Sequence, residues 1–572
     1  MANFGFIIDN RRCIGCHACT VACKSEHDVP IGVNRTWVKY IEKGTFPDSR
    51  RLFSVMRCNH CDDAPCVTIC PVTALFRRSD GIVDFDNRRC IGCKACMQAC
   101  PYDALYIDPD TRTAAKCNYC AHRVDLGLEP ACVNVCPTRA IVSGDLDDPD
   151  SAISRLKSRQ PVSVRKPEKG TLPQLFYIDG DRHSLEPMAT SPGGDSLWGG
   201  QTGGVGHFAG DGEQPVAGNG QAAQAAPLAS QTTDGELPDH AAASGSNVPH
   251  PLDGLRQSLG LLDPVDGVLE PSVVPDLAGS GSGPGESVQR SYDTPNKGVL
   301  WGWPVSAYVW TKAIAAGSGM VLAAAALFGN DLAPAGIQWT AWLMASLFLG
   351  LTGFLLVVDL DQPKRFAWVL LRPQWRSWLV RGAVIISVYA ALLAVWLYRL
   401  VLGHGIGQGV LAWLVLVCGG LTAVYTAFLF AQARGRDFWQ SPLLAVHMLV
   451  HSLMAGAATL CVAGVFSGFQ SWQPFLSIVL AVALPAKLLV DACELCTSHT
   501  TADGRLVVRM ITRGRFRHLY RYGVVLGGCI LPLLIVAGGP VWLYPLAGLL
   551  VLGGLFVAEH LWVRVPQLVS LG

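Results

Sequence analysis

Sixteen of the chain's twenty-one cysteines lie between residues 13 and 136, and their spacing divides them into four quartets. The quartets are Cys13, Cys16, Cys19, Cys23; Cys58, Cys61, Cys66, Cys70; Cys90, Cys93, Cys96, Cys100; and Cys117, Cys120, Cys132, Cys136. A [4Fe–4S] cluster takes three thiolates from a tight C-x2-C-x2-C loop and a fourth from a remote segment, often just before a proline. Pro71, Pro101 and Pro137 follow three of the quartets, and Lys24 follows the first. The spacing therefore predicts four [4Fe–4S] clusters.

The cysteine segment is also repeated. Residues 9–23 (DNRRCIGCHACTVAC) and 86–100 (DNRRCIGCKACMQAC) agree at twelve of fifteen positions, as if one two-cluster unit occurred twice. In two-cluster ferredoxins the last cysteine of each run ligates the other cluster. We therefore expect exchange of ligands between quartets, although the spacing leaves the pairing open.

Two other uses of cysteine compete with this interpretation. Closely spaced thiols leave little room for unstrained disulfides, and residues 1–13 show no export signal that would favour them. Zinc sites use pairs of C-x2-C, which leaves the third cysteine of each loop without a role. Iron–sulfur ligation accounts for all three.

The rest of the composition varies along the chain. Lys and Arg number 45 against 44 Asp and Glu, so the charge gives no reason to expect nucleic acid as a partner. We expect an α+β ferredoxin-like domain over residues 1–187, with short strands such as 5–9 and 81–86. Residues 188–297 are rich in Gly, Ser, Ala and Pro, with Arg256 and Arg290 their main basic residues. Such a segment cannot bury enough apolar surface to fold, so we expect a disordered linker.

Residues 298–572 are hydrophobic in blocks of about twenty residues, the length of a helix that spans a bilayer. We expect an all-α polytopic bundle of eight helices in the lipid bilayer, over 305–328, 336–358, 379–401, 409–431, 441–466, 474–492, 520–538 and 541–563. Loops on one side carry fourteen basic residues and those on the other only Arg399. The positive-inside rule then predicts a multi-pass protein of the prokaryotic inner (plasma) membrane with a cytoplasmic iron–sulfur domain.

Charged residues at membrane depth point to function. Tyr308 and Lys312 share one face of the first helix, and Asp359 ends the second. These groups could offer a quinone carbonyl a donor and a proton source, or Lys312 could simply reach the interface or pair with Asp359. A second polar set, His447, His451, Lys487, Asp491 and Glu494, lies on helices five and six.

Haem b is not expected, because a bis-histidine haem needs one histidine from each of two helices and His447 and His451 share one. The second polar set is better suited to hydrogen bonds between helices or to a proton path.

Two family resemblances cover everything except the linker. The quartets, CVTICPVTAL (66–75) and VRKPEKGTLPQLFYI resemble the four-cluster iron–sulfur subunit of complex iron–sulfur molybdoenzymes, of the dimethyl sulfoxide and polysulfide reductase type. Three stretches resemble the polysulfide-reductase membrane subunit, an eight-helix quinone-reactive anchor without haem. They are WGWPVSAYVWTKAIAAG (301–317), VVDLDQPKRFAWVLLRPQWRSWLVRG (357–382) and ELCTSHTTADGRLVVRMITRGRFRHLY (494–520).

The first resemblance implies how the ligands are exchanged. Cys13, Cys16 and Cys19 would share a cluster with Cys136; Cys117, Cys120 and Cys132 with Cys23; Cys58, Cys61 and Cys66 with Cys100; and Cys90, Cys93 and Cys96 with Cys70.

The resemblances also imply a function. The chain would be the electron-transfer and anchor subunit of a quinone-linked oxidoreductase, not itself catalytic for the terminal substrate. A separate molybdopterin-containing subunit would do the substrate chemistry, and membrane quinone would react near Tyr308, Lys312 and Asp359. In these families the two parts are commonly separate chains, and many of the complexes face the cell exterior. Here the two parts are fused, and the basic loops predict a cytoplasmic cluster domain, so we expect a cytoplasmic-facing complex of the sulfite-dehydrogenase kind. The alternative is a redox-driven ion-translocating membrane module.

Overall fold

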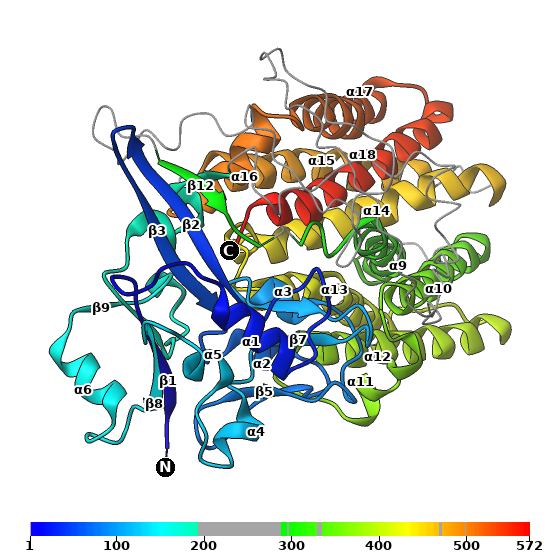
Figure 1. Ribbon diagram of the computed structural model, residues 1–572. Helices are drawn as coiled ribbons and strands as arrows, with labels where there is room; N and C mark the ends of the chain where they lie inside the picture. The colour runs from blue at the N-terminus through cyan, green and yellow to red at the C-terminus, as the bar shows by residue number, and fades with distance from the viewer. Residues whose placement is uncertain are drawn as a thin grey trace, which may run out of the picture.

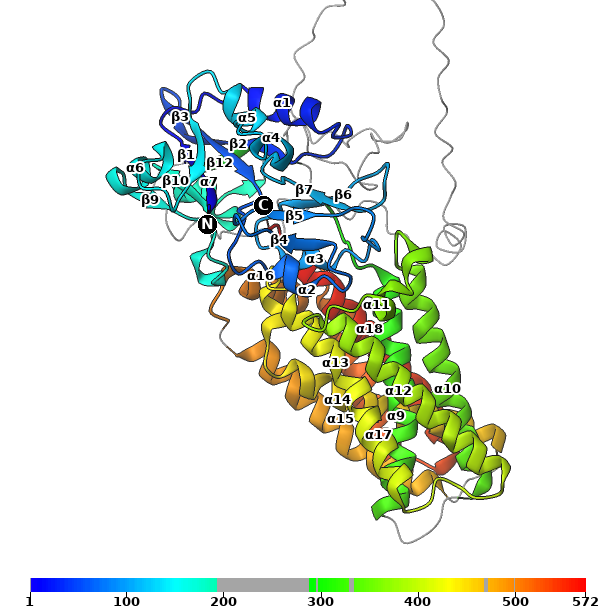
Figure 2. The ribbon, with the colours of Figure 1, turned by 90° about the horizontal axis from the view of Figure 1, so that it is seen from below.

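The structure is a computed structural model that describes residues 2–192, 288–294, 297–328, 334–467, 472–497 and 499–571. Residues 2–192 and 288–294 form an α+β unit, here called the cluster domain. The remaining residues form a helical bundle, and the cluster domain lies against one end of it (Figures 1 and 2). The predicted fold class, an α+β domain followed by an eight-helix membrane bundle, is confirmed.

Two four-stranded sheets frame the cluster domain. The first has the order β8 (Ile141–Asp145), β1 (Phe4–Asp9), β10 (Leu175–Ile178), β9 (Val162–Ser163), and β1 runs parallel to β10. The second has the order β11 (Ser191–Pro192), β12 (Val288–Tyr292), β2 (Thr36–Thr45), β3 (Asp48–Arg57). Phe6, Ile8, Trp37 and Val55 pack between them. This core holds the far end of the domain together.

Two small hairpins lie nearer the bundle. They are β4 (Leu75–Arg77) with β5 (Val83–Phe85) and β6 (Leu105–Ile107) with β7 (Ala114–Lys116). Each follows a short helix that carries cysteines, α2 (Pro65–Ile69) or α3 (Ala95–Ala99). The strands predicted at 5–9 and 81–86 correspond to β1 and β5.

The predicted linker differs from the structure at both ends. Residues 193–287 lie outside the described residues, but β11 and β12 fall inside the range 188–297. They are parallel neighbours, with Ser191 opposite Gln289. Asp293 explains why this end is ordered, because it accepts a hydrogen bond from Trp37 Nε1 at 2.9 Å and lies 3.5 Å from the buried Lys39 ammonium.

In the part of the chain that the structure describes, eight helices are long and apolar enough to cross a membrane. They are α9 (Trp303–Phe328), α10 (Ala335–Val358), α12 (Trp378–Val401), α13 (Val410–Gln432), α14 (Leu444–Ser467), α15 (Gln473–Cys496), η8 (Leu519–Ile530) continued by α17 (Leu531–Gly538), and α18 (Tyr544–Arg564). Leu343, Val395 and Leu489 are exposed on the outside of the bundle, as lipid contact requires. Each helix begins or ends within a few residues of its predicted bounds.

Helices α9 and α14 touch backbone to backbone at two glycines. A Cβ on Gly317 would lie 1.7 Å from the Ser452 carbonyl oxygen, and one on Gly456 would lie 2.1 Å from the carbonyl carbon of Gly317. Only glycine permits so close an approach. The contact brings the polar residues of α14 beside those of α9.

The cluster domain is joined to the bundle by a dense set of polar contacts. Arg436 is buried and donates to Gln98 Oε1 at 2.9 Å and to the Val569 carbonyl at 2.6 Å. Ser377 Oγ donates to the Ile69 carbonyl at 2.7 Å. Gln98 lies in α3 and Ile69 in α2, so the bundle holds the cysteine-bearing helices directly, while Val569 belongs to the C-terminal end of the bundle itself.

Candidate functional site

The cysteines of the cluster domain form four groups, three of which line cavities. The first is lined by Cys13, Cys16, Cys19 and Cys136, the second by Cys58, Cys61, Cys66 and Cys100, and the third by Cys70, Cys90, Cys93 and Cys96. Each cavity combines three cysteines of one quartet with the last cysteine of another.

The fourth group consists of Cys23, Cys117, Cys120 and Cys132. Burial raises the pKa of the Cys23 thiol, and Cys117, Cys132 and Cys120 raise it further because they lie beside it. The four groups are those that the family resemblance implied. That each group ligates one cluster stays a prediction.

The repeated sequence folds into a repeated loop. Gly15 and Gly92 both have φ of 71°, and His17 and Lys94, two residues later, have φ of 58° and 60°. A helix then begins one residue on, at α1 (Ala18–Glu26) and at α3. These left-handed turns wrap the C-x2-C-x2-C segment around its cavity, so three sulfurs converge on one point.

The donor chemistry fits iron–sulfur clusters. All sixteen cysteines are free thiols, and burial raises the pKa of Cys66 and Cys96 well above the usual value. Four thiols pressed together away from water resist ionisation, and a cationic iron–sulfur core reverses that by binding them as thiolates.

Two buried cations lie between cysteine groups. Arg57 is fully buried and donates from Nη1 to Cys132 Sγ at 3.0 Å. Burial disfavours its charge, but the thiols of Cys132, Cys117 and Cys19 outweigh that effect and raise the pKa of Arg57. Lys116, also fully buried, donates from Nζ to the carbonyls of Val83 and Cys117. Sequence reasoning missed both residues, since nothing in the sequence separates them from surface cations.

The groups follow one another in a line. Arg57 lies near cysteines of both the Cys13 group and the Cys117 group. The Cys117 group is next to the Cys58 group through Cys117 and Cys58, and the Cys58 group is next to the last group through Cys66 and Cys96. The last group, Cys70, Cys90, Cys93 and Cys96, meets the bundle.

Side chains of the bundle contact the ligand loop of that last group at three points. Trp301 Nε1 donates to the Cys93 carbonyl at 3.1 Å, and Arg365 Nη1 donates to the Cys90 carbonyl at 2.9 Å. Lys94 pairs with Asp361 at 3.1 Å.

The three residues predicted for a quinone pocket lie on the same side of the bundle. Asp359 follows the last turn of α10, beside Cys93. Tyr308 and Lys312 are buried in α9. Lys312 Nζ donates to the Ala423 carbonyl at 2.9 Å and to Thr426 Oγ1 at 2.6 Å, both on α13. Lys312 therefore lies in the bundle interior, where it is held by α13.

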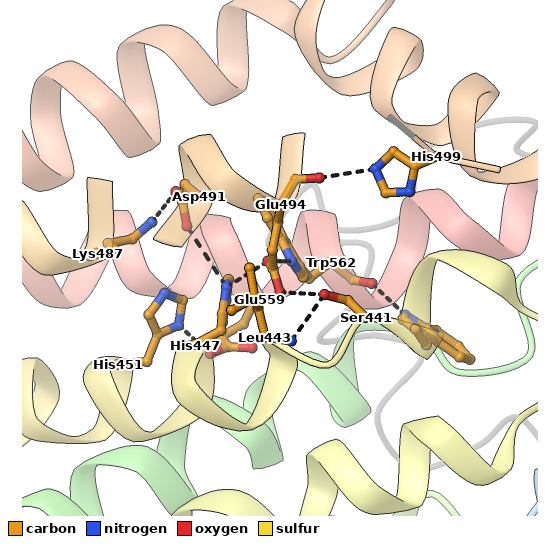
Figure 3. Close-up of polar contacts among 11 residues, drawn as sticks. Ser441, Leu443, His447, His451, Lys487, Asp491, Glu494, His499, Glu559 and Trp562 are labelled. Carbon is orange, nitrogen blue, oxygen red and sulfur yellow. Dashed lines mark hydrogen bonds and ion pairs between the residues drawn. The ribbon is translucent and has the colours of Figure 1, made fainter. Parts of the chain in front are cut away.

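The second polar set forms a buried network between α14, α15 and α18 (Figure 3). His447 Nδ1 lies 2.9 Å from Glu494 Oε2, and Lys487 Nζ lies 2.5 Å from Asp491 Oδ2. His451 Nδ1 lies 2.7 Å from Glu559 Oε1. Sequence reasoning missed Glu559, although a carboxylate inside an apolar span was the available signal.

The network reaches the candidate quinone residues through Glu559. This carboxyl group interacts electrostatically with Lys312 as well as with His447 and Lys487. Trp562 Nε1 donates to Glu494 Oε2 at 3.0 Å and closes the side nearest the cluster domain.

Comparisons with known families agree with this division. Residues 12–75 and 50–146 each match a 4Fe-4S dicluster domain, and residues 293–563 match the family described as polysulphide reductase, NrfD.

Individual relatives match the iron–sulfur part. The B subunit of tetrathionate reductase from Salmonella typhimurium is 45% identical over 189 residues, which are 32% of this chain and 76% of the relative. The B subunit of polysulfide reductase from Wolinella succinogenes is 42% identical over 188 residues, 32% of this chain and 97% of the relative. The arsenate respiratory reductase iron-sulfur subunit ArrB of a Shewanella species is 37% identical over 225 residues, 30% of this chain and 95% of the relative.

These matches account for both parts of the molecule. The dicluster families cover the cysteine groups. The NrfD family begins at residue 293, directly after strand β12, and covers the eight membrane helices up to residue 563. The chain belongs to the family of iron–sulfur reductase subunits that includes the B subunits of tetrathionate and polysulfide reductases, and it carries an NrfD-type membrane domain in the same polypeptide.

Proposed function

We propose that this protein is the electron-transfer and membrane-anchor subunit of a quinone-linked oxidoreductase. The observation that carries the proposal is the line of four cysteine groups that ends where Trp301 and Arg365 contact the ligand loop of the last group. Each group would ligate one [4Fe–4S] cluster, and these clusters, when bound, supply one-electron carriers.

The residues around the last group suit quinone chemistry. Lys312 is aimed at α13 by two hydrogen bonds and lies near Tyr308, four residues earlier on the same helix face. A quinone that accepts electrons needs protons at its oxygens, which Tyr308 and Lys312 can donate, with Asp359 at the membrane boundary to resupply them. The low-dielectric surroundings strengthen those hydrogen bonds.

The catalytic chemistry would belong to a partner. The relatives named above are subunits of reductases, and this chain offers electron carriers and an anchor in place of a substrate site. We therefore propose a molybdopterin-containing catalytic subunit, docked at the end of the line near the Cys13 group. Those relatives give no support for a sulfite dehydrogenase, so the terminal substrate is left to the partner.

We further propose a prokaryotic inner membrane with the cluster domain in the cytoplasm. The basic loops of the bundle lie on the side that holds the cluster domain, since three of their arginines, Arg365, Arg434 and Arg436, contact that domain. Loops rich in Lys and Arg stay on the cytoplasmic side of the membrane, which supports this orientation. In inverted membrane vesicles, added protease should cleave the cluster domain; cleavage in intact cells instead would reverse the orientation.

The quinone reaction is tested by reducing the clusters in the purified full chain and adding a short-chain quinone. The clusters should be reoxidised, and Lys312→Leu should slow this at least tenfold without changing the iron content. Lys364→Leu is the matched control, because Lys364 is exposed in the loop after α10. An unchanged rate in the Lys312 variant would remove it from the pocket, and failure of quinone to reoxidise the wild-type clusters would refute the quinone linkage.

A second candidate function is redox-driven ion translocation, favoured by the buried network from Lys312 through Glu559 and His451 to Asp491. Such a run of ionisable groups at membrane depth could carry protons. Proton translocation is measured as proton uptake by sealed vesicles during quinone turnover. Charge movement lost in Glu559→Gln would support the relay, and turnover without charge movement would exclude it.

A further inference from the structure

Three side chains in the bundle converge without fully satisfying one another. His447, His451 and Asp491 are each 1% exposed, and one potential ligand atom from each lies within 4.8 Å of the other two. The two histidines are four residues apart on α14 and Asp491 faces them from α15 (Figure 3). The ring centroids of His447 and His451 are 4.0 Å apart.

Each histidine has one ring nitrogen close to a carboxylate. Nδ1 of His447 lies 2.9 Å from Glu494, and Nδ1 of His451 lies 2.7 Å from Glu559. Imidazoles that bind metal ions are commonly oriented in this way, with a carboxylate at one ring nitrogen and the metal at the other.

The opposite atoms are unpartnered. Among the residues that the structure describes, Nε2 of His447, Nε2 of His451 and Oδ1 of Asp491 have no hydrogen-bond partner, and Nδ1 of His447 makes an ion-pair contact with Glu494 but no hydrogen bond. Buried polar atoms are normally satisfied, so three in one cluster point to a ligand. Oδ2 of Asp491 is taken by Lys487 at 2.5 Å, which leaves Oδ1 for that ligand.

The charges around the cluster admit a cation. Three carboxylates surround the histidines: Asp491 and Glu494 lie beside His447, and Glu559 lies beside His451. Among the described residues, Lys487 is the one lysine that forms an ion pair with any of these carboxylates, and its partner is Asp491. Two imidazoles and one carboxylate oxygen are a ligand set that suits Zn²⁺, with a fourth position open.

We propose that His447, His451 and Asp491 form a binding site for a divalent transition-metal ion of the zinc type, inside the membrane bundle and separate from the cysteine groups. A bound ion would fix both imidazoles and interrupt the polar network between Glu559 and Asp491. The proposal is independent of the quinone pocket.

The experiment uses the full chain, purified with its clusters, stripped with a chelator and incubated with Zn²⁺. X-ray absorption at the zinc edge then separates sulfur from nitrogen and oxygen neighbours. We expect retained zinc with nitrogen and oxygen neighbours and the multiple scattering of imidazole. Zinc surrounded only by sulfur, or no retained zinc, would overturn the site.

Variants identify the ligands. His451→Gln and Asp491→Asn should each lower zinc retention at least tenfold, while His518→Gln, an exposed histidine on the same side of the bundle, should retain it. Iron content and the cluster absorption spectrum check that each variant folds. Equal zinc retention in all variants would assign the ion elsewhere. If both variants misfold, the wild-type zinc spectrum still decides. Reoxidation of clusters by quinone in the stripped protein is measured separately, so the two proposals fail independently.

Discussion

Arg57 is a buried cation in direct contact with one of the cysteine groups. Its guanidinium is always charged, donates to Cys132 Sγ and lies 4.6 Å from the centre of the Phe6 ring. Its Nε and Nη2 have no hydrogen-bond partner among the described residues. A fixed positive charge beside cluster ligands favours the reduced, more negative state.

We therefore predict that Arg57→Met lowers the midpoint potential of the adjacent cluster. A charged hydrogen bond is worth about 1.5–3 kcal/mol, which for one electron corresponds to about 60–130 mV. Paramagnetic-resonance redox titration measures the shift. Arg57→Lys should restore most of it, and Arg51→Met, on the exposed part of the same strand, should cause none. Equal potentials in wild type and Arg57→Met would show that the charge is offset elsewhere.

At this scale the cysteines could be predicted and the buried cations could not. The four quartets follow from spacing, because a C-x2-C-x2-C loop has few other uses, whereas the exchange of the fourth cysteine between quartets was implied only by the family resemblance. Arg57 and Lys116 become functional only because β3 and β7 carry them between groups that are distant in sequence. Glu559 was predictable in principle, since a carboxylate in an apolar helix needs a partner, and His451 is that partner.

The α9–α14 contact is the element that places the polar residues of the bundle. We predict that Gly456→Ala destabilises the bundle by about 1–3 kcal/mol, as overpacking does, because its methyl group would overlap the backbone of Gly317. Thermal unfolding in detergent, followed by circular dichroism, measures this. The same variant should slow quinone reoxidation by moving Lys312 relative to His451.

Gly353→Ala is the matched control, since a Cβ there has nothing within 4 Å. Alanine is the better helix former by about 1 kcal/mol, so this variant should be neutral or slightly more stable. Equal destabilisation by both changes would mean that the loss does not come from the α9–α14 contact, and an unchanged stability in Gly456→Ala would mean that α9 can shift away from α14 at no cost.

Helix positions were predictable because apolar runs of this length have one stable form in a bilayer. The strand β12 was not predictable, because its residues 288–292 follow a long polar segment and have a similarly polar composition. What orders them is a tertiary contact of Asp293, which lies 3.5 Å from the fully buried Lys39 of β2 and also pairs locally with Arg290 at 3.2 Å.

At the scale of the molecule, the proposed function requires electrons to leave the cluster domain through its interface with the bundle. We predict that Arg436→Met slows quinone reoxidation at least tenfold while all clusters remain, because it leaves Gln98 and the carbonyls of Pro566 and Val569 without their buried donor. Unsatisfied buried groups cost about 1–3 kcal/mol each. Stopped-flow reoxidation by quinone measures the rate.

Arg434→Met provides the comparison. Arg434 pairs with Asp63 at 2.6 Å, but both side chains are well exposed, at 39% and 48%. Exposed pairs contribute about 0–1 kcal/mol, so this variant should behave as wild type. If both variants lost the reaction to the same extent, the interface would depend on charge in general and not on the buried donor.

The pairing of β11 with β12 changes what the connection between the two parts must do. Since Ser191 lies opposite Gln289, residues 193–287 start and finish on one sheet of the cluster domain, and the stretch that crosses to the bundle runs only from Asp293 to Trp303. Excising 193–287 and closing the gap with about ten Gly and Ser residues should therefore preserve iron content and the quinone rate. The covalent tether between the two parts is then the short stretch from Asp293 to Trp303, while the contacts of Trp301 and Arg365 set how close the last cysteine group lies to the bundle.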